Sequence, residues 1–199
     1  LNKKINNIDI SKYKGVGGDI DLKKPFLLVS QHPVTTEYGD NRLKMEETLE
    51  ALNELKMPTI MLWPNADAGS DEISKGIRTF REFNNSEWLH VYKNLPIEIY
   101  IKLMEKTSCL VGNSSSGIRE GAFIGTPVVN IGTRQESRMR SKNVIDVDYG
   151  KDNILAAIKA QLNKGSYSRD TIYGSGNTGK KIAEILSWVD PALQKRISY

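Results

Sequence analysis

Residues 109–120 read Cys109-Leu110-Val111-Gly112-Asn113-Ser114-Ser115-Ser116-Gly117-Ile118-Arg119-Glu120, an apolar run followed by small polar residues. The apolar part predicts a short buried strand, and the hydroxyl residues predict a turn that opens a helix over about 115–124. The first N–H groups of a helix have no partner inside it, and the helix dipole adds positive charge there. Such a turn suits a phosphate group, with the serines as hydroxyl donors and Gly117 allowing a ligand close to the backbone.

A second interpretation of this turn is an ordinary capped helix start. Serine is a common N-cap residue, and a cap needs no ligand. Glu120 lies about one helical turn into the expected helix. Its carboxylate could reach back to a cap N–H or outward to sugar hydroxyls. Both interpretations stay open on the residues alone.

The rest of the chain alternates short apolar runs with amphipathic segments from Phe26 onward. Because this alternation is typical of strands that are covered by helices, we predict an α/β fold, a Rossmann-like parallel sheet with helices on both faces. Expected strands lie at 26–29, 59–62, 88–91, 109–111, 127–129 and 144–145. Expected helices lie at 42–56, 72–83, from Pro96 onward, at 115–124, around Ile154–Leu162, and around Ile182–Val189, where Ile182, Ile185, Leu186 and Val189 should face a core.

Residues 1–24 differ from the rest because they are polar and contain Gly15-Val16-Gly17-Gly18. Such a composition predicts a flexible or loosely packed lead-in or inter-domain linker. We therefore expect one folded domain over 25–199. The chain starts at Leu1 instead of Met, and we expect it to be part of a longer protein.

Composition excludes several classes of protein. The 199 residues are 39% hydrophobic and contain no apolar run near the ~20 residues of a membrane helix, so no membrane partner is expected. The polar N-terminal residues lack a signal core, which favours a cytoplasmic protein. A net charge of +4 without a basic stripe does not favour nucleic-acid binding. One cysteine and two histidines make a metal site improbable, and no metal is expected.

The loops after the expected strands hold most of the unusual polar residues. His32 follows the first strand, where it could touch an anion or transfer a proton, or simply bond to nearby backbone. Asn65 follows the second strand, where a cap role and a ligand role compete evenly. Arg134 follows the fifth strand, next to the expected phosphate site, and an anion contact is favoured there. In parallel sheets these loops share one edge, where ligands bind.

At these loops the chain resembles the C-terminal domain of the hydrolysing UDP-N-acetylglucosamine 2-epimerases of sialic and nonulosonic acid biosynthesis. The resemblance covers about residues 26–148, with its motifs in family order. The motifs are His32-Pro33-Val34-Thr35-Thr36, Pro64-Asn65 with Asp67-Ala68-Gly69-Ser70, Gly112-Asn113-Ser114-Ser115 with Gly117 and Arg119-Glu120, and Gly125-Thr126-Pro127 through Gly132-Thr133-Arg134-Gln135.

The resemblance implies half of a two-domain, glycosyltransferase-B-like architecture in which this half binds UDP. It implies that Ser114 and Ser115 bind the diphosphate, Glu120 the ribose hydroxyls, and His32 the region of the leaving phosphate as a catalytic residue. Arg134, Asn65 and Gly117 complete the implied nucleotide site. Asp71 and Asn94 depart from the family pattern, which puts the contacts at those two positions in doubt.

The implied reaction eliminates UDP from UDP-N-acetylglucosamine and then adds water, which gives N-acetylmannosamine. No cofactor is implied. The implied partners are UDP, the UDP-sugar and an N-terminal catalytic half, and a homo-oligomer stays open. Without that half we expect nucleotide binding and no turnover. The alternatives are an epimerase of a diacetamido-trideoxy UDP-sugar on the legionaminic acid route, a glycosyltransferase of the same architecture, and a non-catalytic UDP-sugar-binding module.

Overall fold

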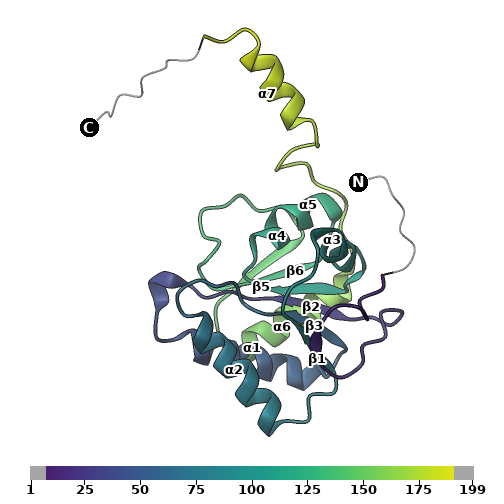
Figure 1. Ribbon diagram of the computed structural model, residues 1–199, viewed down its shortest axis with the longest axis vertical. Helices are drawn as coiled ribbons and strands as arrows, with labels where there is room; N and C mark the ends of the chain where they lie inside the picture. The colour runs from purple at the N-terminus through teal and green to yellow at the C-terminus, as the bar shows by residue number, and fades with distance from the viewer. Residues whose placement is uncertain (1–7, 191–199) are drawn as a thin grey trace.

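The protein is described by a computed structural model over residues 8–190, which form a seven-stranded sheet and its helices (Figure 1). The strand order is β1-β4-β3-β2-β5-β6-β7, and every neighbouring pair is parallel except β1 with β4. The predicted parallel sheet is therefore confirmed, with one antiparallel edge strand added. The strands are β1 Gly15–Gly17, β2 Leu27–Ser30, β3 Thr59–Leu62, β4 Leu89–Tyr92, β5 Cys109–Gly112, β6 Val128–Ile131 and β7 Val144–Val147.

Helices cover both faces of the sheet, as predicted. In Figure 1, α1, α2 and α6 lie on one side of the strands, and α3, α4 and α5 lie on the other. A short 3-10 turn, Thr35–Glu37, precedes α1. The helices are α1 Asn41–Leu55, α2 Ser70–Phe83, α3 Ile97–Lys106, α4 Ser115–Ile118, α5 Glu120–Ile124, α6 Lys151–Lys164 and α7 Thr178–Leu186. Within residues 8–190, none of them has the length and apolar character needed to cross a membrane.

Side chains of the central strands alternate between two hydrophobic clusters. Leu27 and Val29 of β2 pack with residues of α1, α2 and α6, while Leu28 packs with residues of α3. Successive side chains of a strand point to opposite faces, so a strand covered on both faces is apolar throughout. This explains the unbroken apolar runs that predicted the strands.

The order in which the chain adds strands to the sheet reverses between β2 and β5. From β2 the chain proceeds outward through β3 and β4, and then returns to the other side of β2 to add β5, β6 and β7. Neighbouring loops at the carboxyl ends of β2 and β5 therefore diverge to opposite sides, which leaves space for a ligand at this switch point. His32 and the serine turn follow these two strands.

The lead-in segment is packed on the sheet, contrary to the expectation of a loose linker. Gly15–Gly17 pair with β4, and Ile10 is buried in the cluster that contains α3. A Cβ at Gly17 would lie 2.1 Å from the backbone oxygen of Leu89, so glycine is what permits this close pairing. The division of the chain into 1–24 and 25–199 stays a prediction, and its residues 1–7 and 191–199 lie outside the described range.

Two helices differ from the expectation. The helix expected over 115–124 is broken at Arg119 into α4 and α5. The final helix, α7, extends away from the sheet in Figure 1, and its apolar side chains are exposed instead of facing a core. Amphipathic spacing predicted the helix correctly, but within residues 8–190 its apolar face does not pack on a core.

Candidate functional site

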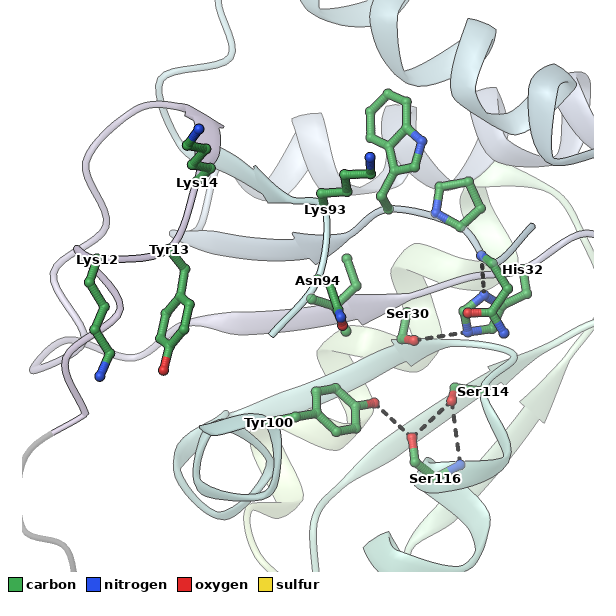
Figure 2. Close-up of a pocket in the computed structure, with 14 residues that line it drawn as sticks. Lys12, Tyr13, Lys14, Ser30, His32, Lys93, Asn94, Tyr100, Ser114 and Ser116 are labelled. Atoms are coloured by element: carbon green, nitrogen blue, oxygen red, sulfur yellow. Dashed lines mark hydrogen bonds between the residues drawn. The ribbon is translucent and has the colours of Figure 1, made fainter. Parts of the chain in front are cut away.

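A cleft of about 720 Å³ opens at the carboxyl edge of the sheet, above the switch between β2 and β5. Figure 2 shows the Lys12–Lys14 segment on one side of the cleft and His32 with the serine turn on the other. Polar side chains from six different segments therefore converge on one space. The cleft is lined by Lys12, Tyr13, Lys14, Ser30, His32, Leu62, Trp63, Pro64, Asn65, Lys93, Asn94, Tyr100, Ser114 and Ser116.

The serine turn presents a chain of hydroxyl groups to this cleft (Figure 2). The hydroxyls of Ser114 and Ser116 lie 2.9 Å apart, and the Tyr100 hydroxyl lies 2.7 Å from that of Ser116. Ser114 is also the N-cap of α4 and accepts from the N–H of Ser116 at 3.4 Å. Ser114 therefore caps the helix and also faces the cleft, and its contact with a phosphate stays a prediction.

Asn113 connects the ends of β2 and β5. Its Oδ1 accepts from the N–H of His32 at 2.7 Å, and its Nδ2 donates to the oxygen of His32 at 2.8 Å. The carboxamide thus occupies the place that a further backbone pair would take in the ladder. Because Asn113 is buried, this pair of hydrogen bonds fixes the backbone at His32 relative to the serine turn.

The His32 ring has a defined tautomer. Its Nδ1 accepts from the N–H of Asn65 at 3.2 Å, so a neutral ring carries its proton on Nε2. Nε2 lies 3.2 Å from the Ser30 hydroxyl and donates to it. Burial, together with the positive charge of Arg134, lowers the pKa of His32 to about 4 against the opposing effect of Asp67. His32 is therefore neutral at pH 7 and presents an N–H beside the cleft.

Arg134 contacts Asn113 and Asp67. One guanidinium nitrogen donates to the backbone oxygen of Asn113 at 3.2 Å, and another lies 3.6 Å from the Asp67 carboxylate. Gln135 donates to the same oxygen of Asn113 at 2.9 Å. The β6–β7 loop is thus bound to the residue that immediately precedes Ser114.

The predicted site residues divide into two groups in the structure. His32, Asn65 and Ser114 line the cleft, which places three of the predicted residues together. Ser115 lies between two lining residues in the sequence, and Arg134 donates to Asn113, the residue before Ser114. Neither Ser115 nor Arg134 is among the lining residues. The structure therefore brings together the loops after β2, β3 and β5, as the sequence predicted. Arg134 lies outside the lining of the cleft and contacts the backbone of Asn113.

Gly117 packs closely against the strands below α4. A Cβ at this position would lie 3.0 Å from Val128 Cγ1 and 3.1 Å from Leu110 Cδ2, side chains of the sheet below. Glycine here lets α4 pack closely on the strands, so its missing side chain does not open space for a ligand. A ligand contact at the Gly117 backbone stays a prediction.

Glu120 faces a separate cavity of about 420 Å³ between α3, α5 and residues 169–176. It is not among the residues that line the larger cleft. Its carboxylate nevertheless lies near enough to Tyr100 that its charge contributes to raising the pKa of that phenol, after the larger effect of burial. A contact between Glu120 and a nucleotide in the cleft stays a prediction.

Several cleft residues were missed by sequence reasoning. Lys12, Tyr13 and Lys14 belong to the segment whose composition predicts a linker, and the helical spacing of Tyr100 predicts only a place on the apolar face of α3. The hydroxyl of Tyr100 was the one available signal, since a buried tyrosine needs a hydrogen-bond partner. Between residues 8 and 190 no group of three or more His, Cys, Asp or Glu side chains could hold a metal ion.

A protein-family model described as UDP-N-acetylglucosamine 2-epimerase matches residues 4–187. The UDP-N,N'-diacetylbacillosamine 2-epimerase (hydrolyzing) of Legionella pneumophila is 31% identical over 188 residues, which are 91% of this chain and 49% of that protein. The UDP-N-acetylglucosamine 2-epimerase of Neisseria meningitidis is 30% identical over 159 residues, 78% of this chain and 41% of the relative. The chain thus spans about half the length, or less, of these curated relatives.

Solved structures show the same fold. The UDP-GlcNAc 2-epimerase of Methanocaldococcus jannaschii, solved in complex with UDP-GlcNAc and UDP, matches with a TM-score of 0.65 at 17% identity. That match covers 83% of this chain and 45% of the other. The match of the family model over most of the chain settles the assignment, and the chain belongs to the UDP-N-acetylglucosamine 2-epimerase family.

Proposed function

We propose that this chain is the UDP-binding half of a hydrolysing UDP-sugar 2-epimerase. The observation that carries the proposal is the cleft at the switch point, where the Ser114–Ser116–Tyr100 hydroxyls meet an N–H of neutral His32. Hydroxyl and N–H donors suit the oxygens of a diphosphate. The chain matches about half of the Legionella relative. This supports a UDP site in the matched half and the groups that act on the sugar in the other half.

Lysines around the cleft favour an anionic ligand. Lys12, Lys14 and Lys93 all line it, whereas none of the lining residues within 8–190 is an aspartate or a glutamate. A cleft lined by one sign of charge raises the local concentration of counter-charged ligands. A nucleoside diphosphate therefore fits the electrostatics of the cleft as well as its donors.

In the proposed reaction, a base removes the proton from C2 of the sugar while the bond from C1 to the UDP oxygen breaks, which gives a glycal and UDP. Water then adds, with a proton at C2 on the opposite face and hydroxyl at C1. We assign the groups that act at C2 to the part of the relatives that this chain does not match. His32 would donate Nε2–H to the leaving phosphate in place of Ser30, which stabilises the negative charge that develops there.

A second substrate is favoured by one comparison. The Legionella relative, which matches 91% of this chain, is named for UDP-N,N'-diacetylbacillosamine and not for UDP-N-acetylglucosamine. The two sugars differ in substituents away from the nucleotide, and this chain binds the nucleotide end in our proposal. A role in sialic acid biosynthesis, a cytoplasmic location and a homo-oligomer stay predictions.

Calorimetric titration of the chain with UDP tests the proposal. We expect UDP to bind, and Ser116→Ala to weaken binding about five-fold or more, since it loses a hydroxyl between Ser114 and Tyr100. Ser187→Ala, which changes an exposed serine after α7, is the matched control and should leave binding unchanged. Absence of UDP binding, or equal binding by the two variants, would count against the proposal.

Titration with UDP-N-acetylglucosamine extends the same experiment. Similar affinities for UDP and for the UDP-sugar would support assigning sugar recognition to the other half. Glu120→Ala then tests whether the nucleotide reaches from the cleft to the second cavity. A loss of UDP affinity in that variant would support a ribose contact, and an unchanged affinity would exclude it.

A further inference from the structure

The carboxylate of Glu37 joins three segments that are distant in the sequence. It receives a hydrogen bond from Lys44 of α1 at 2.5 Å and one from the Tyr149 hydroxyl at 3.0 Å. It also receives one from the hydroxyl of Thr133, in the β6–β7 loop. One side chain at the end of the 3-10 turn thus binds α1 and both loops that flank β7.

This carboxylate is held in its charged form. Burial alone would raise the pKa of Glu37, but the hydrogen bonds from Lys44, Thr133 and Tyr149 outweigh it and keep the pKa below its usual value. The Lys44 ammonium also lies 4.7 Å from the centre of the Tyr149 ring. The four side chains form one compact polar cluster around a single negative charge.

Backbone packing leaves little freedom next to this cluster. Gly132 has a φ of +69°, and a Cβ there would lie 2.2 Å from the Tyr149 hydroxyl oxygen. A glycine in the left-handed region could act as a pivot for the loop that follows it. The hydrogen bond from Thr133 to Glu37 fixes the residue immediately after that pivot.

The anchored residue leads directly to the candidate site. Arg134 and Gln135 follow Thr133, and both donate to the backbone oxygen of Asn113. Asn113 in turn holds the His32 backbone. A continuous path of hydrogen bonds and adjoining residues therefore runs from Glu37 to the residue that precedes the serine turn.

We infer that Glu37 is a positioning residue: it fixes the β6–β7 loop through Thr133 and so holds Arg134 against the end of β5. The inference about position stands on the contacts alone, and its consequence for UDP binding rests on the proposed function. The loop is ordered before a ligand arrives, so less conformational entropy is lost on binding.

Hydrogen exchange of the free chain tests the positioning directly. Thr133→Val removes the hydroxyl donor at nearly constant volume, and Glu37→Ala removes the acceptor. Both should raise amide exchange over residues 133–138 several-fold, and the double variant should exchange no faster than the single ones. Thr79→Val, the same change at a half-buried threonine of α2, is the control and should leave this segment unchanged. Unchanged exchange in Thr133→Val would overturn the inference.

UDP titration then separates a positioning role from a merely structural one. Thr133→Val should weaken UDP binding about five-fold while the melting temperature stays near that of the parent chain. In an Arg134→Ala background the same change should cause no further loss, because Glu37 acts through Arg134. An equal loss in both backgrounds would overturn the role, whereas a parent chain that binds no UDP would contradict the proposed function and leave the exchange result to decide the positioning.

Discussion

The two ends of the described chain contrast in how they relate to the sheet. Residues 8–24 contain an edge strand, bury Ile10 and supply three residues to the cleft. At the other end, the apolar side chains of α7 and of the residues directly after it are 38 to 74% exposed: Ile182, Ile185, Leu186, Trp188 and Val189. The polar, glycine-containing segment is thus integrated into the fold, and the amphipathic helix is not packed on it.

This contrast teaches what a local pattern can predict. An amphipathic stripe shows that a helix will bury one face, but it does not say against which surface. An edge strand pairs through its backbone, which leaves little trace in side-chain composition. The following predictions test whether the two ends differ energetically as they differ in contact.

The largest effect is expected at Gly17 of β1. Gly17→Ala places a Cβ 2.1 Å from the Leu89 oxygen at a φ of +139°, and should lower the free energy of unfolding by about 3 kcal/mol. Gly176→Ala, at a φ of +89° with open space around it, is the matched change in the segment before α7 and should cost only the backbone strain of about 1–2 kcal/mol. Chemical denaturation measures both, and equal losses would break the comparison.

Acidification should weaken the body of the fold through His32. The pKa is about 4 in the folded chain, against an ordinary value of 6.5, so the unfolded chain takes up its proton first as the pH falls. The neutral His32 ring contributes about 3 kcal/mol to the free energy of unfolding. This contribution is complete above pH 6.5 and is lost as the pH falls from 6.5 to 4. Urea unfolding at pH 7 and at pH 4.5 should show a smaller pH dependence in His32→Gln than in the parent, and identical pH dependence would refute the prediction.

Ile10 offers a milder test of the integrated end. Ile10→Ala should lower the free energy of unfolding by about 2 kcal/mol, because a buried side chain of the α3 cluster is truncated. The same variant should also weaken UDP binding if the Lys12–Lys14 segment depends on Ile10 for its position. A melting curve that matches that of the parent chain would show that the lead-in contributes no stability.

The smallest effect is expected in α7. Ile185, which is 49% exposed, loses little packing when it is changed to alanine, so Ile185→Ala should alter the free energy of unfolding by less than about 0.5 kcal/mol. The comparison with Ile10→Ala uses the same chemical change at both ends. A loss near 2 kcal/mol at Ile185 would mean that α7 packs on a surface in solution.

The central architecture could be predicted because its strands are apolar on both faces and short. Each of the six expected strands overlaps an observed one, and Thr59–Leu62 matches in full. The packing role of Gly117 could not be predicted, because it depends on how closely α4 approaches Val128 and Leu110 of the sheet. The helix propensity of residues 115–124 carries no information on the distance between the helix and the sheet.

The site was predicted in outline and missed in its connections. Residues after β2, β3 and β5 were expected to meet because the carboxyl ends of parallel strands share an edge. Glu37 could not be identified, since its partners Lys44, Thr133 and Tyr149 come together only through the order of the strands. A sequence shows which loops carry polar groups, and the topology decides which of those groups touch.

The double hydrogen bond of Asn113 has a consequence for the chemical lifetime of the chain. An asparagine followed by a small residue such as Ser114 deamidates when the next backbone nitrogen attacks the side-chain carbonyl. Here that carbonyl and its amide are both bonded to His32, and the residue is 1% exposed. Deamidation would replace a donor with a negative charge beside the serine turn, so the fold that builds the cleft also protects it from ageing.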